Sequence, residues 1–350
     1  MKKSILILFA GTFFLGSCTK EKDNDDNPTC NDCITSIDDS FLYVSNEGPF
    51  GGTGSISKIN LSTNSIENSF YADANNDIPI GSVVQSLHVI EDRGYAILNG
   101  GNEVAAFNVN SFENNTIISI NYPRYMTSLN NDGFITSGNY AGKVYRIDLI
   151  TNMITDSVEV GYGPEQLLIS GEQLIVTNSG GWGSDSTISI INLATFEVDT
   201  NIIIGSKPTD LVGDKNGMIW ILASAQYDAN NTPKLVQLDP SDWSVLKSIE
   251  IGTADESINK IALNSKGDGI IYYNATDVYA LNISDNNSPS NALINEDGLY
   301  GVEVDPLSGD IFLFDKIDYT STGFVHRYTS TGVFKTTYDV GVLPNGGVFK

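Results

Sequence analysis

A repeated unit of four short β-type runs is the feature that most constrains this chain. Its clearest copy covers residues 162–205, where runs rich in Ile, Leu and Val are separated by Gly, Asn and Asp. These runs leave no room for a helix, so the unit predicts a four-stranded antiparallel sheet. The third run of each copy ends in Asn or Asp between apolar residues. These marker residues are Asn60, Asn108, Asp148, Asn192, Asp239 and Asn282, with a degenerate seventh copy at Arg327 and Tyr328.

The spacing of the markers predicts a ring of seven sheets. Successive markers lie 48, 40, 44, 47 and 43 residues apart, and another 46 residues lead to Tyr328. Four strands in a repeat of this length are typical of one blade of a β-propeller. A lone sheet of this kind cannot bury both of its apolar faces, so the sheets must stack on one another. The sequence therefore predicts an all-β fold, a seven-bladed β-propeller.

The two ends of the repeat predict how the ring closes. The first unit begins with its second strand at residues 41–46 and lacks the strand that opens the other units. Residues 343–349, Leu-Pro-Asn-Gly-Gly-Val-Phe, look like the missing strand. We expect this C-terminal strand to complete blade 1, because that pairing removes two open sheet edges. On this basis the propeller spans residues 39–350.

Residues 1–38 have the pattern of an export and anchoring segment. Lys2 and Lys3 precede an apolar run that is too short to span a bilayer, and Leu-Gly-Ser-Cys follows it. This ending resembles the bacterial lipobox. We therefore expect a signal peptide over residues 1–17 and lipidation of Cys18, with an unlipidated exported chain as the alternative. Residues 18–38 then form an acidic tether to the outer membrane, and the acids behind Cys18 favour display at the cell surface over a periplasmic orientation.

Cys30 and Cys33 form the one Cys-x-x-Cys pattern of the chain. A structural zinc ion takes about four protein ligands, and only His88 and His326 could add imidazoles. A short disulfide formed outside the cytoplasm is therefore favoured over a redox or metal site. Both histidines fall within predicted strands, where a structural role is expected. We expect neither a metal nor a cofactor.

The charge of the chain narrows the range of partners. Acidic residues number 43 and basic residues 19, which gives a formal net charge of -24. This balance disfavours nucleic acid and anionic membrane surfaces as partners. No Asp-x-Asp-x-Asp-Gly loop is present, so the acidity is better explained by solubility than by a metal site.

The direction of the strands locates a candidate ligand site. In each blade, the loop that leads into the innermost strand and the loop between the second and third strands lie on the same face. Polar residues of the first kind of loop should surround the mouth of the central channel, and they are Gln85, Arg124, Tyr125, Glu165, Asp210 and Tyr300. Loops of the second kind add Asn102 and an aromatic residue in five blades, namely Phe50, Tyr140, Trp182, Tyr227 and Tyr319.

Aromatic rings interleaved with amides suit a flat or ring-shaped ligand that carries many neutral hydrogen-bonding groups. The alternative for any single ring is that it only caps the end of a blade. The set of five favours ligand binding, and no catalytic residue is assigned.

Several short runs resemble the YncE-like seven-bladed propeller lipoproteins. They are residues 43–48 with 50–51, 122–125, 163–165, 178–180 and 207–210, and the resemblance covers essentially the whole mature chain. The best-understood branch, the BtuG-type proteins, captures cobalamin at the cell surface and passes it to a TonB-dependent transporter in the outer membrane. The resemblance therefore implies a corrinoid as ligand and such a transporter as partner.

Two other functions stay open at this point. One is a glycan-binding or adhesion propeller, because aromatic platforms also stack on sugars. The other is a propeller lactonase or quinoprotein. The enzyme is least favoured, because both histidines lie outside the rim loops and no Gly-x-Ser-x-Gly motif is present.

Overall fold

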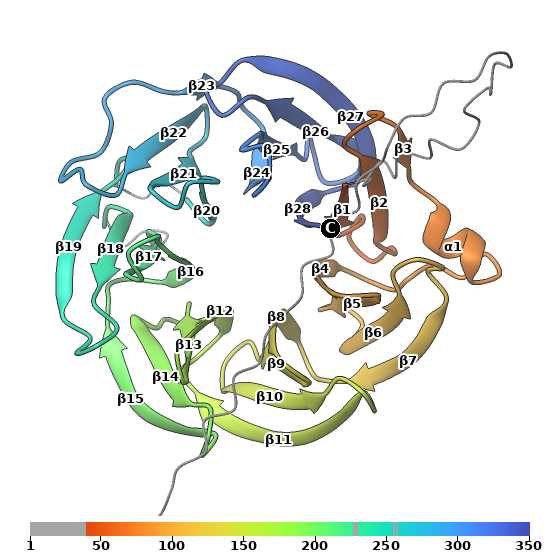
Figure 1. The fold of residues 1–350 in the computed structure, drawn as a ribbon, viewed down its shortest axis with the longest axis horizontal. Coiled ribbons are helices and arrows are strands. Elements are labelled where there is room, and N and C mark those ends of the chain that lie inside the picture. Colours follow the sequence, from red (N-terminus) through yellow and green to blue (C-terminus); the bar gives the residue numbers. More distant parts are fainter. Residues whose placement is uncertain (1–39, 227–229, 255, 257) are drawn as a thin grey trace, which may run out of the picture. The chain divides into compact units, whose positions relative to one another are not determined.

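The computed structural model describes residues 40–226, 230–254, 256 and 258–350. Asp39–Lys350 form one compact unit, built from seven four-stranded antiparallel sheets arranged in a ring (Figure 1). The predicted all-β, seven-bladed β-propeller is confirmed. The predicted signal peptide, the lipidated Cys18 and the Cys30–Cys33 disulfide lie outside the described residues.

Each blade is numbered in chain order. Blade 1 contains β1 (Phe41–Asn46), β2 (Ser55–Asn60), β3 (Ile66–Glu67) and β28 (Pro344–Phe349), and blade 2 contains β4 (Val84–Ile90), β5 (Arg93–Leu98), β6 (Glu103–Asn108) and β7 (Asn114–Ser119). Blade 3 contains β8 (Pro123–Leu129), β9 (Asp132–Ser137), β10 (Gly142–Asp148) and β11 (Met153–Val160), and blade 4 contains β12 (Pro164–Ser170), β13 (Gln173–Asn178), β14 (Thr187–Asn192) and β15 (Glu197–Ile203). Blade 5 contains β16 (Pro208–Gly213), β17 (Ile219–Ala223), β18 (Lys234–Leu238) and β19 (Val245–Glu250). Blade 6 contains β20 (Ile261–Leu263), β21 (Gly269–Tyr273), β22 (Asp277–Asn282) and β23 (Ile294–Asn295), and blade 7 contains β24 (Leu299–Val304), β25 (Ile311–Asp315), β26 (Thr322–Tyr328) and β27 (Phe334–Val342).

The C-terminal strand closes the ring as expected. β28 is the innermost strand of blade 1 and pairs antiparallel with β1, from Leu42 opposite Phe349 to Asn46 opposite Pro344. The last residue continues this ladder, because the Phe41 N–H donates to the Lys350 carbonyl at 2.8 Å. Every blade therefore has four strands, although blade 1 joins the two ends of the chain.

The hydrophobic core lies between the blades, because each sheet is apolar on both faces. The contact of blades 7 and 1 is an example, in which Phe312 and Phe314 pack with Leu42 and Val44 and all four side chains are fully buried. Stacking around the axis buries both faces of every sheet, which a free sheet could not do.

The marker residues form a repeated turn on one side of the ring, which we call the turn face. The Asn60 side chain accepts the N–H groups of Ser62 and Thr63, both at 2.9 Å, as expected for an Asx turn. The residue four positions after the marker adopts a left-handed conformation and donates its N–H to the marker carbonyl. Five blades share this geometry, at Asn64, Phe112, Asn152, Phe196 and Trp243.

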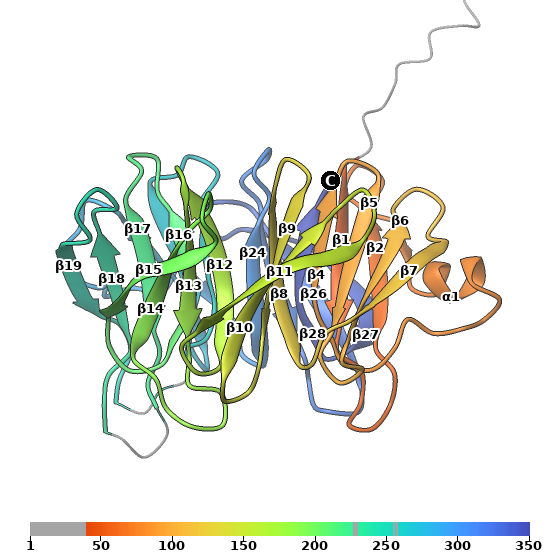
Figure 2. The ribbon, with the colours of Figure 1, turned by 90° about the horizontal axis from the view of Figure 1, so that it is seen from below.

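The other side of the ring, which we call the mouth face, carries the loops that lead into the innermost strands (Figure 2). Six of these strands follow a residue with positive φ: Val83, Tyr122, Gly163, Lys207, Gly298 and Leu343. Its carbonyl accepts an N–H from the end of the second strand, as in the 3.1 Å bond from Gly138 to Tyr122. The same six innermost strands then shift register by a β-bulge, whereas β20 shows no such shift.

One element departs from the predicted pattern. A five-residue helix, α1 (Phe70–Ala74), lies between blades 1 and 2, where the outer strand β3 has only two residues. Its Phe70 ring lies 4.1 Å from the Phe112 ring, and Tyr71 is buried. The helix therefore covers apolar surface that a longer outer strand would cover in another blade. In the described part of the chain, no helix has the length and apolarity needed to cross a membrane.

Candidate ligand-binding site

The β-bulges of the innermost strands direct polar side chains toward the channel at the mouth face. A bulge turns a side chain away from the regular alternation of the strand, and here it falls next to Gln85, Arg124, Glu165, Thr209 and Tyr300. These side chains surround a cavity of about 200 Å³. Its lining is Glu47, Gln85, Arg124, Tyr125, Glu165, Lys207, Thr209, Asn259, Lys260, Tyr300 and Asn345.

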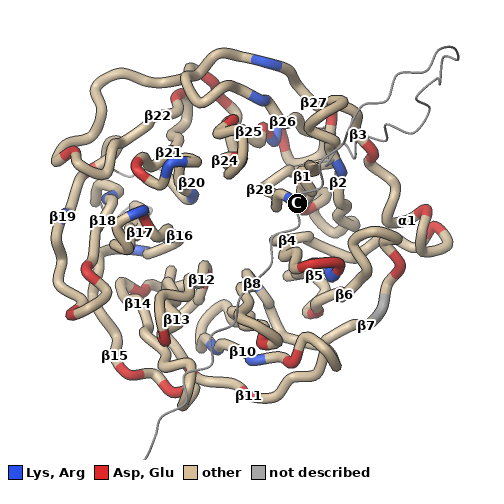
Figure 3. The backbone as a smooth tube through the Cα atoms, viewed as in Figure 1, with Lys and Arg blue, Asp and Glu red and all other residues tan. Residues whose placement is uncertain are grey.

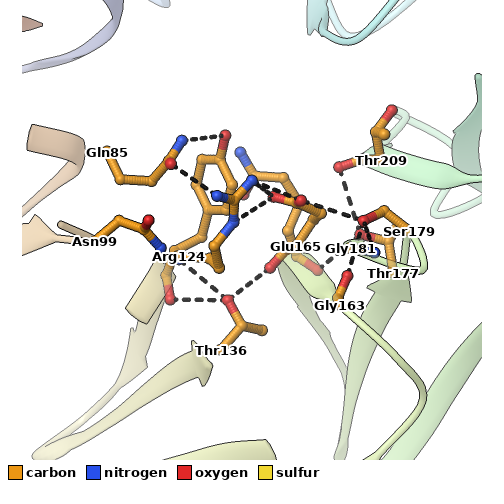
Figure 4. A network of polar contacts seen from close by, with 12 residues as sticks. Gln85, Asn99, Arg124, Thr136, Gly163, Glu165, Thr177, Ser179, Gly181 and Thr209 are labelled. Atoms are coloured by element: carbon orange, nitrogen blue, oxygen red, sulfur yellow. Dashed lines mark hydrogen bonds and ion pairs between the residues drawn. The ribbon is translucent and has the colours of Figure 1, made fainter. Parts of the chain in front are cut away.

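A charged pair bridges blades 3 and 4 at this cavity (Figure 4). The Arg124 guanidinium donates to both carboxylate oxygens of Glu165, at 2.7 Å and 2.8 Å from Nη2 and 3.0 Å from Nε. Its Nη1 also donates to the side-chain oxygen of Gln85 at 3.0 Å. Both charged side chains are mostly enclosed, with 24% and 12% of their surfaces exposed. This forked pairing fixes the arginine in one orientation.

Lys260 reaches across the channel from blade 6. Its Nζ donates to the Asn345 carbonyl of blade 1 at 2.7 Å and lies 5.7 Å from the centre of the Tyr125 ring. Burial alone would lower the pKa of Lys260, but electrostatic interactions with the Tyr125 phenol and the carboxyl groups of Glu303 and Asp210 raise it overall. The ammonium group of Lys260 therefore stays charged at neutral pH. It places a positive charge beside the channel, directly before β20 (Figure 3).

Carboxyl groups lie deeper in the channel than the mouth cavity. Asp210 and Glu303 line a second cavity of about 280 Å³. Lys260 lines both this cavity and the mouth cavity, so it lies between them. Burial raises the pKa of Glu303 to about 7, although Lys260 opposes the shift. Burial likewise raises the pKa of Asp210 to about 6, against two backbone N–H groups at 2.9 Å from Leu211 and Ile261. Both carboxyls therefore titrate near neutral pH.

Hydroxyl groups of the second strands hold the neighbouring innermost strands in place. Thr136 Oγ1 of blade 3 donates to the Glu165 carbonyl of blade 4 at 2.7 Å. Thr177 of blade 4 makes the same bond to the Thr209 carbonyl of blade 5 at 3.4 Å, as Figure 4 shows. The bulged strands are thus connected to one another around the mouth.

Three aromatic rings form an exposed cluster where blades 3 and 4 meet. The Trp182 ring lies 6.0 Å from Tyr122 and 5.8 Å from Tyr140, both in edge-to-face geometry. Trp182 is 68% exposed and Tyr140 is 56% exposed. Their loops are nevertheless fixed, because the Trp182 N–H donates to the Asn139 carbonyl at 3.0 Å. The three rings therefore form a solvent-exposed surface whose backbone is fixed by hydrogen bonds.

A second aromatic group lies on blade 7. The Lys316 ammonium lies 4.7 Å from the centre of the Tyr300 ring and 5.0 Å from that of Tyr319. Tyr300 lines the mouth cavity, so this cation–π stack connects the cavity to the exposed loop that carries Tyr319. Phe50 on blade 1 is also fully exposed.

The structure brings together only part of the predicted site. Gln85, Arg124, Tyr125, Glu165 and Tyr300 line the mouth cavity together, whereas Asp210 lines the deeper one. Phe50, Tyr140, Trp182 and Tyr319 lie in loops of the mouth face and do not line the mouth cavity. Asn102 has a turn role, since its side chain accepts the Tyr122 N–H at 2.9 Å. Tyr227 lies outside the described residues.

Six residues that line the mouth cavity are absent from the predicted site: Glu47, Lys207, Thr209, Asn259, Lys260 and Asn345. One signal could have identified Lys207, because it directly precedes Pro208 at the start of an innermost strand. Asn345 follows Pro344 in the closing strand, as Thr209 follows Pro208, and its side chain donates to Glu47 at 2.9 Å. Burial raises the pKa of Glu47, and this hydrogen bond opposes the rise.

The two histidines lie in strands, as expected. His88 in β4 is bonded to the Ser128 hydroxyl at 2.8 Å, and burial lowers its pKa to about 4. His326 in β26 is bonded to Thr337 at 2.9 Å. Neither residue lines the mouth cavity.

Comparison with solved structures shows the same fold in proteins of low sequence identity. A functionally unknown protein from Desulfotomaculum acetoxidans DSM 771 is 13% identical, with a TM-score of 0.68 over 89% of this chain and 98% of that one. A quinonprotein alcohol dehydrogenase-like protein from Bacteroides thetaiotaomicron VPI-5482 is 15% identical, with a TM-score of 0.66 over 89% and 78% of the two chains. Hydrazine synthase from Kuenenia stuttgartiensis is 13% identical, with a TM-score of 0.63 over 82% and 90%.

The family comparison covers most of the propeller. No curated protein matches the chain. A family model described as a domain of unknown function, DUF5074, matches residues 41–340, from the first strand to within the last outer strand. The chain therefore belongs to the DUF5074 family.

Proposed function

We propose that this protein binds a small molecule at the mouth of its propeller and does not transform it. The observation that carries the proposal is the convergence of non-equivalent polar side chains from several blades on one cavity. A scaffold that only had to close a ring would need no such variety, because the same strand positions could carry the same residue in each blade. Concave sites with a few fixed polar groups are typical of ligand binding.

The leading candidate ligand is a corrinoid such as cobalamin, as the resemblance to BtuG-type proteins implies. The mouth cavity of about 200 Å³ is smaller than the roughly 300–1,000 Å³ of sites that enclose a drug-sized ligand. A corrin ring would therefore rest across the mouth while one of its amide arms enters the cavity. Gln85 offers an amide group at that position, and the exposed aromatic rings would border the macrocycle.

Anchoring and transport complete the proposal. The resemblance supports lipidation at Cys18, a location at the outer membrane on the cell surface, and delivery of the ligand to a TonB-dependent transporter. Ser40 lies on the turn face, where its carbonyl accepts the Leu61 N–H at 3.0 Å. The described part of the propeller therefore begins on the side away from the mouth, and an anchor before Ser40 would leave the mouth free to meet a transporter.

A glycan is the second candidate, favoured by the exposed cluster of Tyr122, Tyr140 and Trp182. Exposed aromatic rings can stack on the apolar faces of sugar rings. In this case the aromatic cluster would form the site and the mouth cavity would not.

Calorimetric titration of the chain from residue 19 onward with cobalamin, and separately with a panel of oligosaccharides, tests both candidates. Saturable binding of cobalamin at micromolar concentration, weakened by Gln85→Ala, is the expected result. Heat released only by an oligosaccharide would favour the glycan. If cobalamin produced no signal at micromolar concentration, the corrinoid hypothesis would be wrong.

A further inference from the structure

The blade interfaces near the turn face are filled by side chains from both neighbouring blades. One contribution is a large residue of the second strand, and another is the residue four positions after the marker of the following blade. Between blades 3 and 4 these are Phe134 and Phe196, whose rings lie 5.9 Å apart. Between blades 1 and 2 they are Tyr43 and Phe112, at 5.7 Å. This pairing fills the interface where it opens to the turn face.

Where one contribution is small, the other compensates. Between blades 4 and 5 the second strand supplies only Ile175, but Trp243 of blade 5 packs against the same cluster. Between blades 5 and 6 the second strand supplies the large, buried Trp220. The Lys247 ammonium lies 5.9 Å from the Trp220 ring and donates to the Ile283 carbonyl of blade 6 at 2.7 Å.

Between blades 6 and 7 both contributions are small. The second strand again supplies an isoleucine, Ile271. The turn of blade 7 lacks the marker geometry, because it is closed by Gly332 at φ 81 and a 2.8 Å bond from the Thr329 N–H to the Val333 carbonyl. Thr329, one position after Tyr328, takes the marker's place in this turn, because the N–H groups of the markers Asn60 and Asn108 likewise donate to a carbonyl at the far end of the turn. Val333, four positions after Thr329, is 61% exposed and does not fill the interface. A cavity of about 540 Å³ occupies this interface.

Exposure of one strand position shows that this opening is particular to blade 6. Ala280 lies two residues before its marker, opposite Ile271 in the sheet. Its counterparts Ala106, Ile190 and Gln237 are 3%, 0% and 6% exposed, and those of blades 1, 3 and 7 are at least half-buried. Ala280 alone among these positions is exposed, and it lines the cavity. The degenerate seventh repeat thus leaves a space that aromatic rings occupy at two other interfaces.

The walls of the cavity define what it can hold. Ile271, Val304 and Ile311 form an aliphatic floor, and all three are buried. Hydroxyl groups of Ser308, Ser330 and Thr331 lie at the rim, together with the exposed Lys266 and with Asp268, whose carboxylate is paired with Lys215 at 3.0 Å. A flat apolar body with a polar or anionic edge would match this arrangement, since the floor offers dispersion contacts and the rim offers hydrogen bonds.

We propose that the interface of blades 6 and 7 is a second binding site, which takes a planar aromatic small molecule that carries a hydroxyl or carboxylate group. The bound ring occupies the place that Phe112 and Phe196 take at other interfaces. This site lies on the turn face, so it is independent of the mouth and of the ligand proposed there. Cavities with apolar walls bind small aromatic molecules in this manner when no side chain fills them.

The test uses 4-hydroxybenzoate as the probe and cyclohexanecarboxylate as a non-planar control of the same charge. The chain from residue 19 onward, labelled at its alanine methyl groups, is titrated with each compound up to about 10 mM, a range that detects millimolar binding. The expected result is a saturable shift of the Ala280 methyl resonance with 4-hydroxybenzoate only, while the Ala106 methyl resonance stays unchanged. An equal shift with the cyclohexane, or none with either compound, would overturn the proposal.

A matched pair of substitutions separates site loss from unfolding. Ala280→Phe should fill the cavity, reduce affinity for 4-hydroxybenzoate by at least about tenfold, and keep or raise the melting temperature. Ala106→Phe places the same ring in an interface that is already full, so its melting temperature should fall. Unchanged affinity in folded Ala280→Phe would show that the probe binds elsewhere, and loss of folding in Ala280→Phe alone would show that the space is not available to a ring.

Discussion

The two faces of the ring are built by the same strands, yet their loops follow different rules. On the turn face, five blades repeat one turn in which a marker residue accepts backbone N–H groups, and in three of them an aromatic residue four positions later packs into the interface with the preceding blade. On the mouth face, six blades repeat the left-handed residue and the bulge, but the bulged side chains differ from blade to blade. Backbone geometry therefore repeats on both faces. The residue four positions after the marker packs against or hydrogen-bonds to the preceding blade, whereas the bulged side chains line an open cavity.

This difference indicates which positions of a repeat protein can change to give ligand specificity. A turn that packs into the neighbouring blade has to keep its shape, because its side chain fills a defined space. A bulged side chain that points into a channel meets no such requirement. Arg124, Thr209 and Tyr300 can therefore occupy related positions without disturbing the ring.

The largest expected effect on stability comes from removing β28, the strand that connects the mouth face to the turn face in blade 1. Deleting residues 344–350 removes β28, which holds Asn345 at the mouth and pairs with Phe41 at the turn face. Two sheet edges would open and the ring would lose its closure, so we expect a loss of more than about 5 kcal/mol, which is most of the stability of a typical domain. Thermal unfolding followed by circular dichroism should lose its cooperative transition, while Lys350→Gln should keep it. An unchanged melting temperature in the deletion would refute the closure.

The next effect concerns the turn face alone. Phe196 is 5% exposed and fills the interface of blades 3 and 4, so Phe196→Ala should cost about 3–5 kcal/mol without changing ligand affinity at the mouth. Val333 holds the related position in blade 7 and is exposed, so Val333→Ala should cost less than about 0.5 kcal/mol. Denaturant unfolding measures both values. Equal costs for the two substitutions would mean that the turn residue does not fill the interface.

A smaller effect concerns the channel and depends on pH. Burial raises the pKa of Glu303 from its ordinary 4.5 to about 7, so the folded chain holds this proton over a range in which the unfolded chain has lost it. Stability from this group is thus fully present below pH 4.5 and is lost as the pH rises through 7. Glu303→Gln should remove that loss and stabilise the protein at pH 8 by about 1–3 kcal/mol, at about 1.4 kcal/mol per unit of pKa shift.

The control for that measurement is Glu197→Gln, at an exposed position of β15. Denaturant unfolding at pH 5 and pH 8 should show the gain of the Glu303 variant only at the higher pH. A gain of the same size at both values would point to packing and not to the charge.

The aromatic cluster should affect ligand affinity more than stability. Trp182 and Tyr140 are more than half exposed, so Trp182→Ala combined with Tyr140→Ala should change stability by less than about 1 kcal/mol. Affinity for cobalamin should fall by about tenfold or more, because each ring contributes about 0.5–1.5 kcal/mol of stacking. Phe334→Ala, an exposed ring of β27, should leave the affinity unchanged. Wild-type affinity in the double variant would place the ligand away from this cluster.

The fold could be predicted because its determinants are local and repeated. Three sequence features predict the same propeller: the marker residues, the runs of branched residues and the Pro-Asn-Gly-Gly segment. Their agreement strongly supports the predicted fold. The helix α1 was missed, because it depends on the shortness of β3 and on the apolar surface near Phe112. Neither is visible in a single segment of sequence.

The site was predictable only in part, for a related reason. Chain direction identified Gln85, Arg124 and Tyr300 as residues of the mouth, since they follow the start of an innermost strand. Lys260 was missed because blade 6 lacks the bulge that the other blades share, and its side chain reaches the channel from a different position. The depth of Asp210 depends on side-chain direction after the bulge, which sequence spacing does not encode.

The position of β28 has a consequence for how the protein is made. Blade 1 joins residues about 300 positions apart, as in the bond from the Ser45 hydroxyl to the Gly346 carbonyl, so the ring stays open until synthesis reaches its last residues. Contacts of such sequence separation are slow to form. The six blades made of consecutive strands can form earlier, so closure of the ring is the step that waits until β28 has been synthesised.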